Sequence, residues 1–333
     1  MEMLWQPGIS IILWLQSLGP GVTAPMRLLS FLGQVEFYLI ILPALYWCWD
    51  SKKALRLGVL LMLSGALNEA LKVAFHQPRP FWVSPAVKAL SVETTFDLPS
   101  GHAQQAVCVW GWLAHRTRRA QAWALAVLLI VLISVSRAYL GVHFPHSLVL
   151  GAAVGAALLG AFARWERTAS VWLARLSLPK QLGIALLASL SLLGLTGAAL
   201  ASLQGWSVPT PWTQLVLQKA GEPIEALAPV YAVMSAGVLF GLGAGAAWLR
   251  HRGGFSAKGT IIQRLLRYPL GMAALVILWF GVESRLPDGM GPVALGLRYL
   301  HASLIGLWVA GAAPLLFRRL GLADRGEALA RDG

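Results

Sequence analysis

Long apolar runs alternate with short polar stretches along almost the whole chain. The runs Ala124–Val135, Leu182–Leu200 and Pro229–Leu249 contain no charged residue. A helix needs about 20 mostly apolar residues to cross the hydrocarbon core of a bilayer, so these runs indicate transmembrane helices. We expect an interfacial segment at residues 5–19, followed by nine spanning helices near residues 26–49, 54–75, 100–115, 120–140, 147–163, 181–203, 227–249, 268–286 and 299–317.

Composition supports an all-α, polytopic membrane protein. Hydrophobic residues make up 57% of the chain and charged residues 12%, whereas a soluble domain carries about 25% charged residues. Tryptophans such as Trp165 and Trp248 lie near the ends of apolar runs, where an amphipathic ring suits the membrane interface. The first residues lack the basic region and cleavage site of a signal peptide, so we expect the first helices to remain in the mature protein.

Basic residues gather in alternate loops. Most of the 27 lysines and arginines follow the first, third, fifth, seventh and ninth expected helices. By the positive-inside rule these loops are cytoplasmic, with the N-terminus outside and the C-terminus inside. The loops at residues 76–99 and 140–146 then face away from the cytoplasm. Compact loops and a composition rich in Ala, Leu, Gly and Arg suggest a bacterial inner membrane, with these two loops in the periplasm.

Charge and cysteine usage argue against several other classes of function. A net charge of +13 would suggest nucleic-acid binding in a soluble protein, but here it follows from the loop asymmetry, so we expect no nucleic-acid partner. Cys48 and Cys108 fall in apolar helices and are interpreted as packing residues. No Cys/His spacing suggests zinc and no Gly-rich loop suggests a nucleotide, so we expect neither a metal nor a cofactor.

Three short segments carry the residues that suggest chemistry, and each lies at the end of an expected helix on the non-cytoplasmic side. The second helix ends near Lys72, and Arg79 follows in the next loop. Residues 99–102, Pro-Ser-Gly-His, open the third helix. The fourth helix ends near Arg137, shortly before His143. With the expected topology, all three segments meet at one membrane face.

Five of these residues suit the binding of a phosphate group. Lys72, Arg79 and Arg137 supply cationic donors, and the arginines offer planar forks that match phosphate oxygens. Ser100 stands where a helix N-cap is expected, and Gly101 leaves room for an oxygen to approach the helix start. Taken singly, a basic residue at a helix end usually reaches for the interface, and Pro-Ser-Gly is often a turn and cap. The combination is what points to an anion site.

Two histidines remain for catalysis. Imidazole titrates near neutral pH, so His102 and His143 could each act as a nucleophile or an acid. A single histidine in an apolar helix is more often hydrogen-bonded structure than a catalyst. Only the ordered set of residues at helix ends favours catalysis over a structural role.

In order and spacing, these residues resemble the three-part signature of the type 2 phosphatidic acid phosphatase (PAP2) superfamily, across roughly residues 30–163. That family includes lipid phosphate phosphatases, undecaprenyl pyrophosphate phosphatases and glucose-6-phosphatase. The resemblance implies a metal-independent phosphatase in which His143 is the nucleophile that forms a phosphohistidine and His102 protonates the leaving oxygen. It also implies that the phosphoryl oxygens are bound by Lys72, Arg79, Ser100, Gly101 and Arg137.

The resemblance divides the chain into a PAP2-like core, residues 1–163, and a C-terminal extension of four spanning helices, residues 164–333. The expected substrate is a phosphomonoester or pyrophosphate at the non-cytoplasmic face. A lipid phosphate comes first because the site lies at the depth of the bilayer interface, and a soluble sugar phosphate is the alternative. The extension carries no second catalytic motif; it could shape substrate access, hold a partner or form a homodimer contact.

One position departs from the family pattern. Most members carry an aspartate four residues after the nucleophilic histidine, but this chain has Ser147. Such a carboxylate fixes the imidazole tautomer and stabilises the imidazolium, and its loss in a Ser–His–Asp hydrolase lowers the rate by about 10⁴. A serine hydroxyl can accept the same hydrogen bond without supplying the charge. The orienting group is then either Ser147 or a carboxylate from elsewhere in the chain.

Glu69 is one such carboxylate, because it lies one turn before Lys72 and next to Asn68 in an expected membrane helix. A simple ion pair between Glu69 and Lys72 explains it slightly better. In a further alternative the site binds a lipid phosphate with weak turnover or none, as in a binding protein or flippase. Glucose-6-phosphatase also has a non-acidic residue at the position of Ser147, so this departure does not by itself imply an inactive protein.

Overall fold

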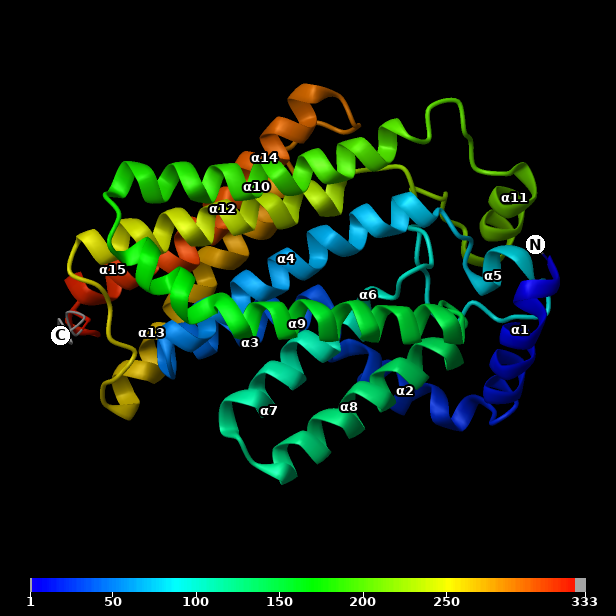
Figure 1. The fold of residues 1–333 in the computed structure, drawn as a ribbon, viewed down its shortest axis with the longest axis horizontal. Coiled ribbons are helices and arrows are strands. Elements are labelled where there is room, and N and C mark those ends of the chain that lie inside the picture. Colours follow the sequence, from blue (N-terminus) through cyan, green and yellow to red (C-terminus); the bar gives the residue numbers. More distant parts are fainter. Residues whose placement is uncertain (1, 327–333) are drawn as a thin grey trace. The chain divides into compact units, whose positions relative to one another are not determined.

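The structure, a computed structural model, describes residues 2–326, and the regular elements within that range are all helices (Figure 1). The all-α fold class expected from the sequence is therefore confirmed. In chain order the helices are α1 (Glu2–Gln16), η1 (Pro20–Val22), α2 (Thr23–Phe31), α3 (Val35–Cys48), α4 (Ser51–Phe75), α5 (Pro80–Val83), α6 (Gly101–Ala106), η2 (Val107–Gly111), α7 (Trp112–Thr117), α8 (Ala120–Tyr139), α9 (Pro145–Ala174), α10 (Leu178–Ala201), α11 (Thr210–Ala220), α12 (Val230–His251), α13 (Ile261–Val276), η3 (Ile277–Val282), α14 (Pro292–Leu307), η4 (Trp308–Ala312) and α15 (Ala313–Arg319).

The protein is an integral membrane protein with fewer clear spans than the nine expected. Among the described residues, seven helical stretches are long and apolar enough to cross a bilayer, or eight if a bent N-terminal pair counts as one span. They are Ser51–Val83, Ala120–Tyr139, Pro145–Ala174, Leu178–Ala201, Val230–His251, Ile261–Val282 and Pro292–Arg319. The two expected spans without a counterpart are residues 26–49, which a turn splits into α2 and α3, and residues 100–115, where the short helices α6, η2 and α7 follow one another.

A sharp corner near the N-terminus brings α2 toward the end of α8. The segments Trp5–Gln16 and Pro20–Phe31 meet at 87°. Gly19 adopts a φ of 83°, a left-handed conformation that glycine takes without strain, and Pro20 starts the next helical turn. The hydroxyl of Tyr139 donates to the carbonyl of Gly19 over 2.8 Å. This bond ties the corner to the last turn of α8, the turn that carries Arg137.

The residues of the PAP2-like signature lie in one of two compact units. This unit comprises the residues up to Phe37, together with Leu67–Ala163 and Leu195–Ala228. It has its own hydrophobic core, built mainly from aromatic and aliphatic side chains of α1, α5, α8, α11 and the intervening loops: Ile12, Phe81, Trp82, Phe96, Tyr139, Val142, Phe144 and Val216. The burial of Phe96 fixes the loop between α5 and α6 that carries several polar side chains of the site.

The second unit comprises Tyr38–Ala66, Arg164–Gly194 and the residues from Pro229 onward. Its core includes Trp47 and Phe317, whose ring centroids lie 5.6 Å apart in an edge-to-face arrangement. Helices α12 and α14 pack at very short range. A Cβ atom at Gly237 would lie only 2.6 Å from the carbonyl oxygen of Tyr299. Small residues at such a crossing let the helix backbones approach closely, as is common in membranes.

The two units are assembled from interleaved segments of the chain. Helices α4, α9 and α10 each contribute residues to both units. The sequence-based division into a core, residues 1–163, and an extension, residues 164–333, remains a prediction.

Candidate active site

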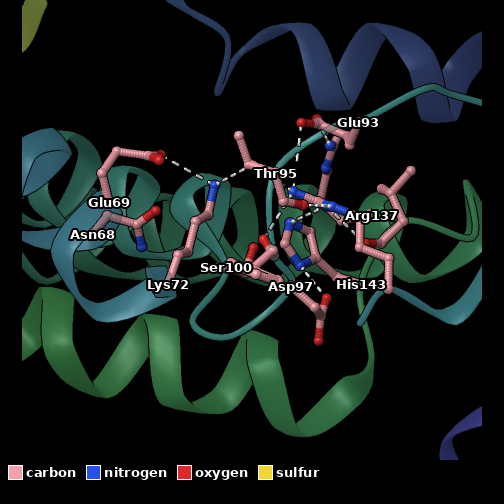
Figure 2. A network of polar contacts seen from close by, with 12 residues as sticks. Asn68, Glu69, Lys72, Glu93, Thr95, Asp97, Ser100, Arg137 and His143 are labelled. Atoms are coloured by element: carbon pink, nitrogen blue, oxygen red, sulfur yellow. Dashed lines mark hydrogen bonds and ion pairs between the residues drawn. The ribbon is translucent and has the colours of Figure 1, made fainter. Parts of the chain in front are cut away.

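Helix ends and two loops of the first unit bring the signature residues together. Lys72 lies in the last turn of α4, Arg137 in the last turn of α8, and Ser100 caps α6. Figure 2 shows the side chains that meet there: Asn68, Glu69, Lys72, Glu93, Thr95, Asp97, Ser100, Arg137 and His143. The three segments identified in the sequence thus converge, and the loop before α6 contributes residues that were not expected.

Arg79 is completely buried and its guanidinium is held by the loop backbone. Its Nε donates to the Thr95 carbonyl over 2.5 Å, and its Nη2 donates to the Phe96 carbonyl over 3.1 Å. Its Nη1 donates to the Val142 carbonyl over 2.8 Å and lies 3.3 Å from Nε2 of His143. These carbonyl partners are neutral and fix the guanidinium in place, and its positive charge remains attractive to an anion.

Lys72 and Asn68 have structural partners on either side of the site. Nζ of Lys72 donates to Oγ1 of Thr95 over 2.9 Å and to Oε1 of Glu69 over 3.2 Å. The contact with Glu69 is the ion pair that the sequence suggested, so the carboxylate of Glu69 is bound to Lys72. Asn68 donates to the Pro99 carbonyl over 3.2 Å and so braces the turn before α6.

Arg137 is also fully buried, and it has one donor still available. Its Nη1 donates to Oγ of Ser30 over 2.6 Å, and its Nη2 forms an ion pair with Glu93. Glu93 also lies 3.6 Å from Nη2 of Arg79. Within the described residues, Nε of Arg137 has no hydrogen-bond partner. A buried donor without a partner is costly, so this atom is well placed to bind an incoming oxygen.

Glu93 stays ionised between the two arginines. Burial by itself would raise the pKa of Glu93, but the charges of Arg137 and Arg79 outweigh burial and hold the pKa well below its usual range. A carboxylate therefore occupies part of the basic site. Glu93 was absent from the residues expected from the sequence.

The start of α6 is built as expected from Pro-Ser-Gly. Ser100 has extended backbone angles, and its hydroxyl accepts from the Ala103 N–H over 3.4 Å, which is the geometry of an N-cap. The N–H of Ser100 donates to the Ser147 carbonyl over 3.0 Å. A Cβ atom on Gly101 would lie 2.9 Å from Oδ1 of Asn68, so a larger residue would disturb the turn.

His143 is buried with its two ring nitrogens in different environments. Nδ1 lies 2.6 Å from Oδ1 of Asp97, and Nε2 faces Arg79. The hydroxyl of Ser147 donates to Oδ2 of the same Asp97. Burial, reinforced by the charge of Arg79, lowers the pKa of His143 well below its usual range. The ring is therefore neutral near pH 7, with a proton on Nδ1 for Asp97 and a lone pair on Nε2.

Asp97 is the main residue that sequence reasoning missed. Its carboxylate is fully buried, and burial raises its pKa to about 7, although the charge of Arg79 acts in the opposite direction. The signal was slight: Glu93 and Asp97 are the two acidic residues in the loop at 76–99, and both face basic or imidazole groups. Asp97 and His143 lie 46 positions apart, so the contact becomes visible only in the folded chain.

His102 lies on the first turn of α6, within electrostatic range of Glu93, Arg137 and Lys72. Its Nε2 atom is buried and has no hydrogen-bond partner among the described residues. The turn after α2 packs against the ring: a Cβ atom on Gly33 would lie 2.8 Å from the Cδ2 atom of His102. The second histidine is therefore held in place and keeps a nitrogen for a proton transfer. No group of three or more potential metal ligands occurs in the described part of the chain.

Two family models match the chain. The model of the PAP2 superfamily matches residues 53–170, and that of the transmembrane extension of PAP2 superfamily phosphatases matches residues 233–325. Together these matches cover more than half of the chain. The protein belongs to the PAP2 superfamily. The first PAP2 match contains every residue that the sequence analysis placed in the site.

The chain is similar in sequence to several proteins that are named as phosphatases. The lipid phosphate phosphatase delta of Arabidopsis thaliana is 30% identical over 171 residues, which cover 46% of this chain and 41% of the relative. The undecaprenyl-diphosphatase of Sulfolobus acidocaldarius is 29% identical over 133 residues, 38% of this chain and 64% of the relative. Glucose-6-phosphatase 2 of Mus musculus is 25% identical over 282 residues, 73% of this chain and 76% of the relative. The chain thus spans less than two thirds of the length of the first two relatives.

Proposed function

We propose that the protein is a membrane phosphatase that hydrolyses a phosphomonoester or pyrophosphate, first of all of a lipid, through a phosphohistidine at His143. The observation that carries the proposal is the orientation of His143. Its Nε2 atom lies 3.3 Å from Nη1 of Arg79, while Nδ1 is engaged by Asp97. A phosphoryl group held by Arg79 would therefore meet the lone pair of Nε2.

The proposed reaction has two steps. In the first, Nε2 of His143 forms a bond to phosphorus while the bond to the leaving oxygen breaks, and His102 gives that oxygen a proton. In the second, His102 takes a proton from a water molecule, whose oxygen displaces His143 and releases inorganic phosphate. Lys72, Arg79 and Arg137 offset the negative charge on the phosphoryl oxygens in both steps. The cap at Ser100 and Gly101 adds polar groups at the same place.

Two observations support a lipid as the substrate. Lys72 and Arg137 lie in the last turns of α4 and α8, two helices long and apolar enough to span a bilayer, and a site at such helix ends is expected at the depth of lipid headgroups. Two of the relatives are named for lipid phosphates or a polyprenyl diphosphate. We place this site on the non-cytoplasmic side, in the periplasm of a bacterial inner membrane, with the N-terminus outside and the C-terminus in the cytoplasm.

A soluble sugar phosphate is the second candidate. The match to glucose-6-phosphatase 2 covers 73% of this chain, a larger share than the matches to the two lipid enzymes cover. A protein that binds a lipid phosphate without hydrolysing it is the third candidate. Glu93 supports this third reading, because it already occupies the arginines that would bind the substrate.

Phosphate release by the purified protein in detergent tests these candidates. Phosphatidic acid, phosphatidylglycerol phosphate, undecaprenyl pyrophosphate and glucose 6-phosphate should be compared on wild-type protein, His143→Ala and His102→Ala. We expect turnover of a lipid substrate by the wild type and none by His143→Ala. Rapid quenching of the wild type with ³²P-labelled substrate should trap an acid-labile phosphohistidine, which should be absent in His143→Ala. His102→Ala should slow both the formation and the hydrolysis of this intermediate. Equal phosphate release by wild type and His143→Ala on every substrate would rule out the proposed enzyme.

A further inference from the structure

Asp97 makes a set of contacts that is specific to His143 and its neighbours. Its Oδ1 lies 2.6 Å from Nδ1 of His143, and its Oδ2 accepts from the hydroxyl of Ser147. The backbone N–H of Phe144 also donates to this carboxylate. The N–H of Asp97 itself donates to the Gln77 carbonyl over 2.9 Å, which fixes the backbone of the loop at this point. The carboxylate is thus fully buried, hydrogen-bonded on both oxygens and held in one orientation.

The role of Ser147 follows from the direction of its hydrogen bond. The hydroxyl gives its hydrogen to Asp97, so Ser147 braces the carboxylate rather than aiming the imidazole itself. Ser147 lies in the first turn of α9, four residues after His143, and its hydroxyl reaches the carboxylate that contacts the ring. An aspartate at position 147 would stand against Asp97, and two buried carboxylates at such range repel each other. The presence of Asp97 and the absence of an aspartate at 147 are therefore linked.

We propose that Asp97, on the loop before α6, is the positioning carboxylate of His143, and that it replaces the aspartate that α9 lacks at position 147. This proposal rests on the proposed function. With Nδ1–H donated to Asp97, the lone pair of Nε2 faces Arg79 and the substrate. When Nε2 bonds to phosphorus the ring gains positive charge, and the ionised Asp97 offsets it. Asp97 touches no substrate atom and acts through His143.

Relocation of the carboxylate tests the proposal. Asp97→Asn should lower kcat by about 10³–10⁴, by analogy with the loss of the aspartate in a Ser–His–Asp triad. Ser147→Asp alone should also lower kcat, because it adds a second buried carboxylate. The double variant Asp97→Ser, Ser147→Asp returns one carboxylate to the ring and should recover at least about tenfold over Asp97→Ser. Asp288→Asn, an exposed loop carboxylate, is the matched control and should equal wild type.

A second readout works without turnover. In the ¹⁵N-labelled protein, the Nδ1–H signal of His143, assigned with His143→Gln, should move strongly in Asp97→Asn and stay unchanged in Asp288→Asn. If wild type has no activity on any substrate but this signal moves, the proposed function fails and the positioning role of Asp97 stands. If wild type is active and His143→Ala is not, yet Asp97→Asn retains wild-type kcat, or the double variant recovers nothing while folded, the role of Asp97 is overturned.

A basic cavity in the second unit carries a separate inference. This cavity has a volume of about 760 Å³ and lies among the start of α4, the ends of α9 and α12, and the segment at residues 253–258. Its basic lining residues are Lys52, Arg56, Arg250, Lys258 and Arg325. Asp50 is the one acidic residue among the described lining, and it is paired with Lys53 over 2.9 Å. The charge that faces this cavity is therefore strongly positive.

The cavity also has the depth and lining of a lipid site. Three of its basic residues, Lys52, Arg56 and Arg250, lie near the ends of two spanning segments, which start at Ser51 and end at His251. Leu55, Val171 and Ala246 line it with apolar surface, and an acyl chain requires such surface next to the headgroup. Arg56 is partly neutralised by Glu166 at 3.5 Å. The basic residues of the lining carry more positive charge than the single carboxylate of Glu166 can neutralise.

We infer that this cavity binds the headgroup of an anionic phospholipid. Basic pockets at the ends of membrane helices attract acidic lipids through charge and are screened by salt. The triple variant Lys52→Gln, Arg250→Gln, Arg325→Gln removes three lining charges. The matched control, Lys180→Gln, Arg175→Gln, Arg319→Gln, removes three exposed charges of the same unit that do not line this cavity.

Native mass spectrometry with phosphatidylglycerol titrated into detergent-solubilised protein measures binding directly. We expect the lining variant to bind phosphatidylglycerol about tenfold more weakly than wild type, with phosphatidylcholine bound weakly by both. The control variant should keep wild-type affinity. Equal loss in the two triple variants would mean that the lipid responds to general surface charge, and undiminished binding in the lining variant would place the lipid elsewhere; either result overturns the inference.

Discussion

The Glu93 carboxylate contacts the two arginines that a substrate phosphate is expected to bind, so the two anions should compete for them. Its carboxylate pairs with Arg137 and lies 3.6 Å from Nη2 of Arg79, two buried cations that also suit a phosphoryl group. Its side chain is 26% exposed, while the two arginines are fully buried, so Glu93 can move outward more easily than they can. A bound phosphate would repel the carboxylate, and the cost of displacing Glu93 is subtracted from the binding energy.

Replacement of Glu93 by glutamine should therefore strengthen phosphate binding. We expect Glu93→Gln to lower the inhibition constant for inorganic phosphate or vanadate by about tenfold, because the competing charge is gone while the side-chain volume is kept. Competitive inhibition of phosphate release measures this constant. Glu222→Gln, at an exposed position, is the control. A higher inhibition constant in Glu93→Gln than in the wild type would show instead that Glu93 holds the arginines in position for the substrate.

The pair of Asp97 and His143 predicts the pH dependence of the reaction. Burial raises the pKa of Asp97 to about 7, against the opposing charge of Arg79. The carboxylate is therefore ionised above this pH and takes up a proton as the pH falls through it. Because the proposed mechanism needs the ionised form, kcat should fall on the acid side with a midpoint near pH 7. The residual activity of Asp97→Asn should lack this acid limb; an unchanged limb in that variant would assign the titration to another group.

At the scale of helices, α9 supports the start of α6 through a glycine. A Cβ atom on Gly151 would overlap the carbonyl of Ser100, and one on Gly155 would lie 2.6 Å from the carbonyl of Gln104. Gly151 and Gly155 thus pack directly against the capped turn of the site. A shift of α9 would move Ser100, which caps α6, and Ser147, which braces Asp97.

Gly151→Ala should therefore damage catalysis through geometry. We expect a fall in kcat of about 10²-fold, the size of effect that a displacement of about 1 Å can produce. Gly160→Ala lies on the same helix, where a Cβ atom meets nothing within 4 Å, and it should retain wild-type kcat. Thermal unfolding of both variants separates a local shift from a loss of the fold. Equal kcat in the two variants would contradict the support role of Gly151.

The sequence located most helices but not the loops between them. The apolar runs predict the ends of α4 and α8 closely: residues 54–75 and 120–140 are expected, and the helices extend over Ser51–Phe75 and Ala120–Tyr139. Helix α9 continues to Ala174 beyond the expected end at residue 163, since the charged residues after that point stay helical and Glu166 is paired with Arg56. The loop before α6 was beyond prediction, because buried contacts such as that of Asp97 with His143 join residues far apart in the chain.

At the scale of the whole molecule, the orientation in the membrane decides which compartment supplies the substrate. Helix α8 separates two ends of the first unit: it begins after Arg119, in a cluster of basic residues, and ends near Arg137 and the signature loops. The N–H of Leu90 donates to the carbonyl of Leu140 over 3.1 Å, so the loop before α6 lies at the same end as the site. The charge asymmetry assigns the other end to the cytoplasm.

Single cysteines at the two ends of the first unit test this orientation in cells. In a background with Cys48→Ser and Cys108→Ser, Ala86→Cys places a thiol in the exposed part of the signature-side loop, and Ala120→Cys places one at the start of α8. A membrane-impermeant maleimide should label Ala86→Cys in intact spheroplasts and label Ala120→Cys only after lysis, because each thiol is reachable from one side. Labelling of both variants in lysed cells is the control for accessibility. The reverse pattern would place the phosphatase site in the cytoplasm, and its substrate would then have to come from the inner leaflet or from soluble metabolites.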